Sequence, residues 1–197
     1  AGGASQTITF SSPVVFATPG TSSVDVLLSG LPADGNPNND FATAPVVVTN
    51  IINAANGYFE DFEMGQNGWN IDGPNSSWAF GTPAKAVINS AASGSNAFVT
   101  GGLNLQSSID NGLTWQDVGV CGDPNNWYND NTILGAPGGS QSGWSGRTTS
   151  NNGSNGWVTA WAPTPILATR PNVKFRVAFG TDGSESWEGV AFDDFEI

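Results

Sequence analysis

The sequence predicts an all-β protein, and two observations carry this prediction. Gly, Asn, Ser, Thr and Trp are abundant while Lys, Glu and Leu are scarce, which is typical of a secreted, turn-rich β protein. Few stretches keep a helical period, whereas short β-branched or aromatic runs recur between Gly, Asn and Pro residues. A β-sandwich follows at the level of fold class.

The predicted strands are short runs bounded by turn residues. In the run NVKFRVAFG, Lys174 and Arg176 alternate with Phe175 and Val177, which fits a strand with one face in water. In chain order the predicted strands are QTITF (6–10), SVDVLLSG (23–30), APVVVTNI (44–51), NAFVTGG (96–102), TWQDVGV (114–120), GWVTAW (156–161), NVKFRVAFG (172–180) and GVAFDDFEI (189–197).

A module boundary is predicted near NAANGYFEDFEMG (53–65). Before it, two strand runs are joined by the Gly, Pro, Asn and Asp residues of 30–40, which indicates a hairpin. About three strands make a thin sandwich, below the usual size for independent stability. We therefore predict a partial β module over 1–54 and a larger domain over 55–197.

The charge balance excludes some partners. The 17 acidic and 5 basic residues give a net charge of −12, which argues against nucleic acid or an anionic membrane surface as a partner. No run of about 18 apolar residues is present, so we expect no membrane insertion. Neither a charged, apolar leader nor an initiating Met is present, and the sequence is interpreted as a mature or excerpted segment.

Two adjacent aspartates, Asp193 and Asp194, interrupt the last apolar run. Side chains alternate along a strand, so Asp193 would share a face with Phe195, and one carboxylate would be buried whichever face points inward. A buried carboxylate needs a cation, hydrogen-bond donors or a raised pKa. Because the chain has few cations and no His, a bound metal ion is one candidate.

SSIDNGLTW matches the Asp-box pattern S-x-D-x-G-x-T-W. We expect Asp110 to accept turn amides, Gly112 to supply a positive φ and Trp115 to pack beneath the hairpin. The pattern predicts a β-hairpin, and it carries little information on activity.

Several ordered motifs resemble one family. They are YFEDFEMGQNGWNIDGPNSSWAFGTPAKAVINSAASGSNAFVTGG, DNGLTWQDVG, NNWYND, GWSG and FRVAFGTDGSESWEGVAFDDFEI. Over roughly 56–197 the chain resembles the MAM-like, concanavalin-type jelly-roll modules of secreted and cell-surface proteins of Bacteroidetes, which include adhesins and modular hydrolases. The piece before it resembles the last strands of an Ig-like module. The resemblance implies a jelly-roll β-sandwich with adjacent first and last strands, often with calcium near them, preceded by a partial Ig-like β-sandwich.

In such a jelly roll FEDFE (59–63) and FDDFE (192–196) would meet. Calcium takes six to eight oxygen ligands, which these segments and neighbouring carbonyls could supply. Asp193 is the leading candidate by strand parity, and Glu63 is second because the family pattern carries an acid there. The alternative is that most of these acids are solvated strand residues. The candidate calcium ligands are Asp193, Glu63, Asp61, Asp194 and Glu60.

The sequence departs from the family pattern after NAFVTGGLN. Family modules continue through further strands, whereas here LNLQSS follows at once. Either the protein is a reduced variant, or residues are missing at a break between Thr100 and Ser107 and the numbering continues across it. We expect the break. The partner of the lone Cys121 could lie in such a missing segment, or Cys121 could be a small buried hydrophobe.

Loop tryptophans raise the possibility of carbohydrate binding, because aromatic faces stack on sugar rings. The candidates in loop-like contexts are Trp127, Tyr128, Trp144 and Trp187. The remaining tryptophans are interpreted as core or hairpin anchors; they are Trp69, Trp78, Trp115, Trp157 and Trp161.

The sequence lacks residues that common enzymatic mechanisms require. Without His there is no Ser-His or Cys-His nucleophile and no ordinary zinc site, and paired carboxylates alone are weak support for glycoside hydrolysis. We expect a non-catalytic, calcium-stabilised module of a large secreted or cell-surface bacterial protein, acting in adhesion or recognition. Its partners would be an extracellular glycan or surface protein and other modules of the same chain. The alternative is a carbohydrate-binding accessory domain of a secreted hydrolase.

Overall fold

The protein is all-β, as its composition predicted. Its strands form several small antiparallel sheets, and its described helical turns are α1 (Pro165–Ala168) and a 3-10 turn at Ala54–Asn56. Among the described residues, no helix is long and apolar enough to cross a membrane. The computed structural model describes residues 7, 9, 11–29, 40–49, 51–71, 73, 77–135, 141–146, 154, 156–180 and 188–197.

The chain divides into two compact units. Unit 1 is Ala1–Asn53 with Gly68–Asn70, and unit 2 is Ala54–Asn67 with Ile71–Ile197. That these units are an Ig-like module over 1–54 and a jelly-roll module over 55–197 stays a prediction.

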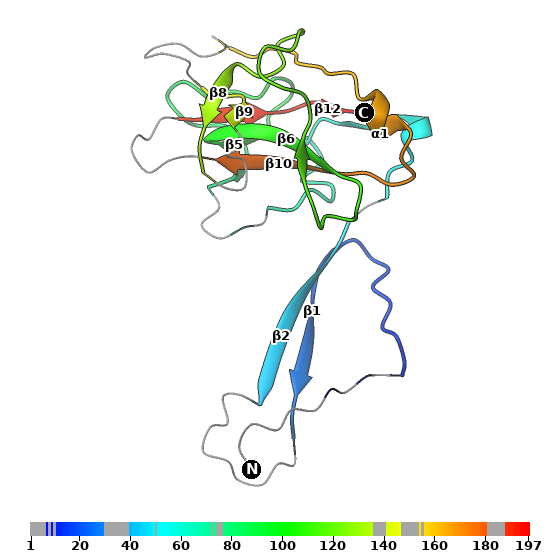
Figure 1. Cartoon of the computed structure of the whole chain (residues 1–197). Coiled ribbons are helices and arrows are strands. Elements are labelled where there is room, and N and C mark those ends of the chain that lie inside the picture. The colour runs from blue at the N-terminus through cyan, green and yellow to red at the C-terminus, as the bar shows by residue number, and fades with distance from the viewer. Residues whose placement is uncertain are drawn as a thin grey trace. The chain divides into compact units, whose positions relative to one another are not determined.

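Unit 1 contains a two-stranded ribbon, drawn in blue and cyan in Figure 1. Strand β1 (Gly20–Leu27) pairs antiparallel with β2 (Phe41–Val48), and the Leu28 N–H donates to the Asp40 carbonyl at 2.8 Å. The predicted hairpin pairing is therefore confirmed. The predicted strand QTITF lies largely outside the described residues.

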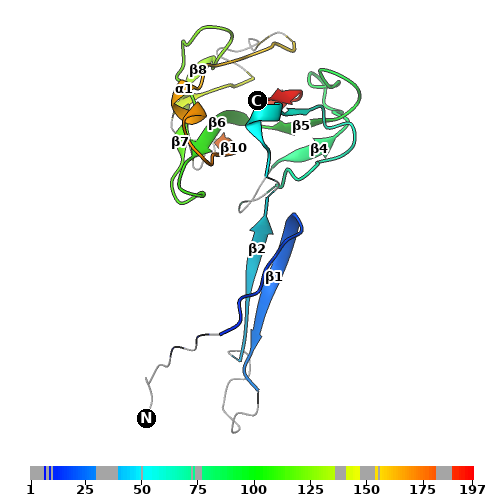
Figure 2. The same cartoon turned by 90° about the vertical axis from the view of Figure 1, so that its right-hand side faces the viewer.

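Unit 2 contains two three-stranded sheets (Figures 1 and 2). In the first, β5 (Ala97–Thr100) lies between β4 (Ala79–Gly81) and β11 (Val190–Phe192). In the second, β6 (Gly102–Ser108) lies between β10 (Lys174–Gly180) and β7 (Gln116–Asp117). All four residues of β5 are buried, because the strand is paired on both edges and covered on both faces.

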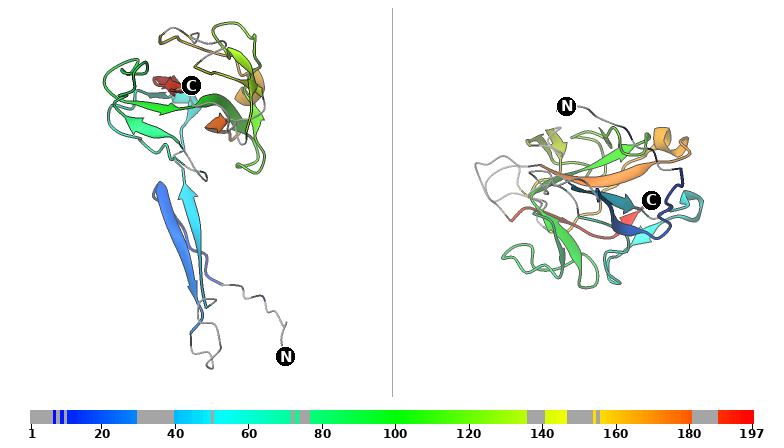
Figure 3. Two further views of the ribbon diagram at one scale, coloured as in Figure 1. Left: turned by 90° about the vertical axis from the view of Figure 1, so that its left-hand side faces the viewer. Right: turned by 90° about the horizontal axis from the view of Figure 1, so that it is seen from below.

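Two shorter strand pairs complete the described part of unit 2. Strand β8 (Asp130–Ile133) pairs with β9 (Gln141–Gly143), and β3 (Phe59–Glu60) pairs with β12 (Phe195–Glu196). Tyr58 and Ile197 extend the second pair by exchanging two backbone hydrogen bonds of 2.9 Å. The prediction that the FEDFE and FDDFE segments meet is therefore confirmed (Figure 3).

The expected break between Thr100 and Ser107 is wrong. Strands β5 and β6 are joined at Gly101, and β6 keeps one register with β10 throughout, including Asn104 opposite Ala178 and Leu105 opposite Val177. The chain is continuous where the family pattern has additional strands.

Aromatic side chains form the core around the first sheet. The Phe98 and Phe192 rings stack at 5.2 Å with an interplanar angle of 6°, and the Phe62 ring packs edge-on against both, at 5.1 and 5.6 Å. Trp78 contacts the same two rings, as predicted for a core residue. Phe98 and Phe62 are fully or almost fully buried.

Two predicted strands differ from the structure. GWVTAW (156–161) forms no strand, although its residues are described. GVAFDDFEI is not one strand but two, β11 and β12, separated by Asp193 and Asp194. Asp194 has a φ of 50°, which is incompatible with a continuing strand.

Candidate functional site

Both segments that carry the candidate calcium ligands turn sharply after a strand. The chain leaves β3 through Phe62, whose φ is 59°, and passes from β11 to β12 through Asp194, whose φ is 50°. A positive φ is uncommon for a bulky residue such as Phe. Because the strand is interrupted here, the parity argument that placed Asp193 on the face of Phe195 is wrong.

Three of the five predicted ligands meet at one loop, Ala92–Asn96, which we call the anchored loop. Glu63 Oε1 accepts the backbone N–H groups of Ser95 and Asn96 at 2.8 and 2.7 Å. Asp193 Oδ2 accepts those of Ala92 and Ser93 at 3.0 and 3.2 Å. The Ser93 hydroxyl donates to Asp194 Oδ1 at 2.8 Å. The carboxylates therefore anchor the loop by accepting its amide groups.

Gly94 lets the Glu63 carboxylate approach the anchored loop. A Cβ on Gly94 would lie 2.2 Å from Glu63 Cδ, and Gly94 has a φ of +55°, which L side chains rarely adopt. The sequence analysis did not identify this loop; the only local signal is the Gly and Ser punctuation of SGSN.

The other two predicted ligands bond to their own segment. Glu60 is buried, with Oε1 accepting the Phe62 N–H and the Asn67 side-chain amide, both at 2.9 Å. Asp61 Oδ1 accepts the Glu63 N–H at 3.1 Å. Both carboxylates stabilise the turn that follows β3 and do not bond to the anchored loop.

The anchored loop meets the requirements of calcium in part. Carboxylate oxygens are ligands that calcium prefers, and Glu63, Asp193 and Asp194 bring them to one place. However, three of the contacting oxygens already accept hydrogen bonds, so carbonyls or water would have to supply most of the six to eight ligands. Within the part of the chain that the structure describes, no group of three or more acidic or Cys side chains is arranged to hold a metal ion.

Partial burial raises the pKa of the Asp193 carboxyl above its ordinary value. Backbone N–H donors of Ser93, Asp194 and Ala92 oppose this effect because they stabilise the charged form. The Asp193 carboxylate is therefore tolerated here because backbone amide groups donate hydrogen bonds to it.

Trp127 and Tyr128 do not line an exposed loop surface, as the carbohydrate-binding prediction required. They are 7% and 4% exposed and form a core cluster with Leu105 and Val118. The Trp127 indole N–H donates to the Val118 carbonyl at 2.7 Å, and the Tyr128 hydroxyl donates to the Leu105 carbonyl at 3.0 Å. Their ring faces are used in packing, so the prediction is wrong for these two residues.

Trp144 is partly buried and packs on the same cluster. Its ring centroid lies 4.8 Å from Trp127 and 4.6 Å from Tyr128, and its indole N–H donates to the Asn126 carbonyl. Cys121 also packs against this cluster as a free, partly buried thiol. Trp187, the fourth candidate, lies outside the described residues.

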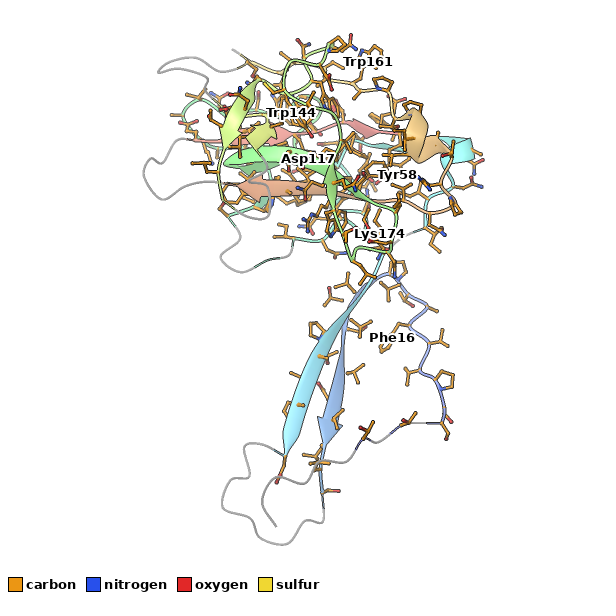
Figure 4. All side chains as sticks on the ribbon, viewed as in Figure 1. Phe16, Tyr58, Asp117, Trp144, Trp161 and Lys174 are labelled. Atoms are coloured by element: carbon orange, nitrogen blue, oxygen red, sulfur yellow. The ribbon has the colours of Figure 1, made fainter. Side chains whose placement is uncertain are left out.

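Trp157 and Trp161 are not core anchors, contrary to the prediction. They are 39% and 57% exposed. Ala160 and Ala162 of the same segment pack against the core cluster instead. Figure 4 shows Trp161 at the edge of unit 2.

The sequence analysis missed a polar network on the second sheet. Asn104 and Gln106 donate to Asp117 Oδ1 at 2.9 and 3.0 Å, and Arg176 donates to Gln106 at 2.8 Å. The Arg176 guanidinium lies 4.3 Å from the centre of the Trp115 ring. Asn104 and Gln106 are 0% and 5% exposed, so this network stabilises the sheet and is closed to a ligand. The alternating polar residues of LNLQSS are the signal that could have predicted it.

The Asp-box prediction is confirmed. Strands β6 and β7 form the hairpin, and Asp110 accepts the N–H and hydroxyl groups of Thr114 at 2.9 and 2.5 Å. Gly112 has a φ of +94°, and a Cβ there would lie 3.5 Å from the Trp115 ring beneath it. This segment is a structural turn.

Comparison of the chain with protein-family models, with curated proteins and with solved structures finds no match. The resemblance to MAM-like jelly-roll modules therefore stays a prediction that depends on the sequence motifs.

Proposed function

We propose that the chain is a non-catalytic module of a large secreted or cell-surface bacterial protein, acting in adhesion or recognition. One observation supports the proposal: the described carboxylates fasten surface loops and turns. Glu63 and Asp193 hold the anchored loop, and Glu188 accepts the N–H groups of Val87 and Ile88 at 2.6 and 2.9 Å. Loops held in one conformation lose less entropy when they bind a partner.

Three carboxylates, Asp110, Glu188 and Asp130, have lowered pKa values, which fits structural roles for them. Hydrogen bonds from Thr114 lower the pKa of Asp110 to about 2, and the Ile88 N–H lowers the pKa of Glu188. For Asp130, burial acts to raise the pKa, but hydrogen bonds from Thr132 and Ser145 outweigh it and lower the pKa. A general acid needs a pKa close to the working pH, so these groups are suited to structural roles.

A carbohydrate-binding accessory domain of a secreted hydrolase is the second candidate. The exposed rings of Trp157 and Trp161 favour it.

Binding of the labelled full chain to a glycan array and to immobilised extracellular proteins tests both candidates. Protein binding without sugar binding supports adhesion, and selective polysaccharide binding supports the accessory domain. Absence of binding to every surface would contradict both. Release of reducing sugar from a bound polysaccharide would contradict the non-catalytic proposal.

We also propose that calcium stabilises the module, because Glu63, Asp193 and Asp194 meet at the anchored loop. Melting in excess calcium should show higher stability than melting in EDTA, by about 2.7 kcal/mol when free calcium is 100-fold above its Kd. Glu63→Gln and Asp193→Asn should lose this response. Asp110→Asn, which changes a carboxylate elsewhere, should keep it. Equal melting temperatures in calcium and EDTA would contradict the proposal.

A further inference from the structure

Two tryptophans of unit 2 are partly exposed to water. Trp157 and Trp161 are 39% and 57% exposed, whereas Trp127 is 7% exposed. Tryptophan is highly buried on average, so an exposed ring is informative. Among the described residues, the Trp161 backbone N–H donates a hydrogen bond, whereas the indole N–H makes none.

Alternation from Ala160 onward directs the Trp161 ring outward. Ala160 and Ala162 are partly buried against the core cluster of Leu105, Val118, Trp127 and Tyr128, while Trp161 and Pro163 between and after them are exposed. In extended backbone, alternate side chains face opposite sides. Anchoring the alanines therefore places Trp161 on the outer side, whereas residues 156–159, Trp157 among them, are exposed without alternation.

Three hydrogen bonds fix this segment to the rest of unit 2. The Trp161 N–H donates to the Asn125 carbonyl at 3.3 Å, and the Asn126 side-chain amide donates to the Thr159 carbonyl at 2.9 Å. The Trp157 indole N–H donates to the Ser90 carbonyl at 3.1 Å. A surface that is already ordered loses little entropy on binding.

The loop beside the segment has a left-handed backbone at three residues. Asn125, Asn126 and Tyr128 have φ values of 66°, 60° and 46°. Asn adopts such values readily, whereas a positive φ is uncommon for a bulky residue such as Tyr128. Here the buried Tyr128 hydroxyl, bonded to Leu105, holds the loop, which places Asn125 and Asn126 next to Trp161 and Thr159.

The tryptophan-bearing segment of this surface carries no charge. The sequence from 154 to 169 has no charged residue, and the neighbouring loop contributes the amides of Asn125 and Asn126. An anionic ligand would find no cation on this segment, in a chain of net charge −12. Aromatic faces with side-chain amides match the C–H faces and hydroxyl groups of a neutral sugar.

We propose that Trp157, Trp161, Asn125 and Asn126 form a binding surface for a neutral polysaccharide. The inference rests on the second candidate function, a carbohydrate-binding accessory domain, and names its ligand class. The two tryptophans are four residues apart, a separation of at most about 14 Å along the backbone. A glycan chain of a few sugar rings is therefore long enough to contact both tryptophans.

Native affinity electrophoresis of the full chain tests the proposal, with soluble xylan, mixed-linkage glucan, mannan and starch in the gel, and alginate as an anionic comparison. We expect retardation by at least one neutral polysaccharide and none by alginate. Trp161→Ala should weaken binding roughly tenfold, the loss of one aromatic contact. Trp161→Phe should retain most of the affinity, and the Trp157→Phe/Trp161→Ala double variant should bind more weakly than Trp161→Ala alone. Phe41→Ala removes an aromatic side chain in unit 1 that is 53% exposed, and it should leave binding unchanged.

The outcomes distinguish a wrong binding surface from a wrong function. If the chain binds a neutral polysaccharide and Trp161→Ala binds as tightly, this surface is wrong while recognition stands. If the chain binds immobilised protein only, and Trp161→Ala abolishes that binding, the surface is a protein interface and the glycan proposal is overturned. If the chain binds neither sugar nor protein, the proposed function itself fails, and the ligand proposal fails with it.

Discussion

Asp110 shows how a single partly exposed residue contributes to the fold. Its carboxylate accepts the backbone N–H and the hydroxyl group of Thr114, together with the hydroxyl of Ser108 at 2.7 Å. These donors favour the charged form and lower the pKa from 3.8 to about 2. The turn therefore depends on an ionised Asp110.

The first prediction concerns the acid stability of this turn. The folded-state pKa of Asp110 lies below its unfolded value, so its contribution is complete above about pH 4 and is lost as pH falls towards about 2. The difference in melting temperature between the wild type and Asp110→Asn should therefore shrink over that range. Other carboxylates titrate equally in both proteins and cancel in the difference. A difference that does not change with pH would contradict the assignment.

The second prediction concerns Gly94. Gly94→Ala places a Cβ 2.2 Å from Glu63 Cδ, so Glu63 must move and lose its hydrogen bonds to Ser95 and Asn96. An alanine at positive φ costs roughly 1 to 2 kcal/mol by itself. Gly122→Ala is the matched control, because Gly122 has a φ of +93° with nothing within 4 Å. In urea unfolding followed by tryptophan fluorescence, Gly94→Ala should lose about 1 kcal/mol more than the control. Equal losses would show that Glu63 does not depend on this contact.

At the scale of elements, the sequence predicted the strands and turns whose determining residues lie close together in the chain. The Asp-box hairpin and strand β10 follow from residues that define their own turn or alternation. Burial in GWVTAW could not be predicted, because either set of alternating residues, the tryptophans or Ala160 and Ala162, could face inward. The structure packs Ala160 and Ala162 against the cluster that contains Trp127 and Tyr128.

The candidate site was predicted in part for a related reason. The meeting of the two acidic segments followed from the family resemblance, and it is confirmed by the pairing of β3 with β12. Their chemical partners could not be predicted, because the amides that Glu63 and Asp193 accept belong to the anchored loop, about 100 residues from Asp193 in sequence. Composition does not encode such long-range backbone contacts.

The third prediction tests the importance of strand β5. Phe98 is 3% exposed and packs against Phe62 and Phe192, so Phe98→Ala should cost about 3 to 5 kcal/mol. Phe59 on β3 is 59% exposed, so Phe59→Ala should change stability by less than about 0.5 kcal/mol. Urea unfolding measured by tryptophan fluorescence compares the two. Similar losses in both variants would mean that the assigned core is wrong.

At the scale of the whole molecule, the two units differ in how completely they cover their apolar surface. In the ribbon of unit 1, Val24 pairs with Ala44 and Val26 pairs with Ala42, so these four side chains share one face. Val24 and Val26 are nevertheless 39% and 41% exposed. A two-stranded ribbon with an uncovered apolar face is at best marginally stable in water.

The fourth prediction follows from this difference. Residues 54–197 expressed alone should keep the unfolding midpoint of the full chain when tryptophan fluorescence is followed, because seven of the eight tryptophans belong to unit 2 and Trp69 alone to unit 1. Residues 1–53 alone should show no cooperative transition by circular dichroism, since their described strands cannot bury the face that carries Val24 and Val26. A cooperative transition of 1–53 that depends on concentration would show that the ribbon covers this face by self-association. A transition independent of concentration, or a lower midpoint for 54–197, would contradict the assignment of two separately stabilised units.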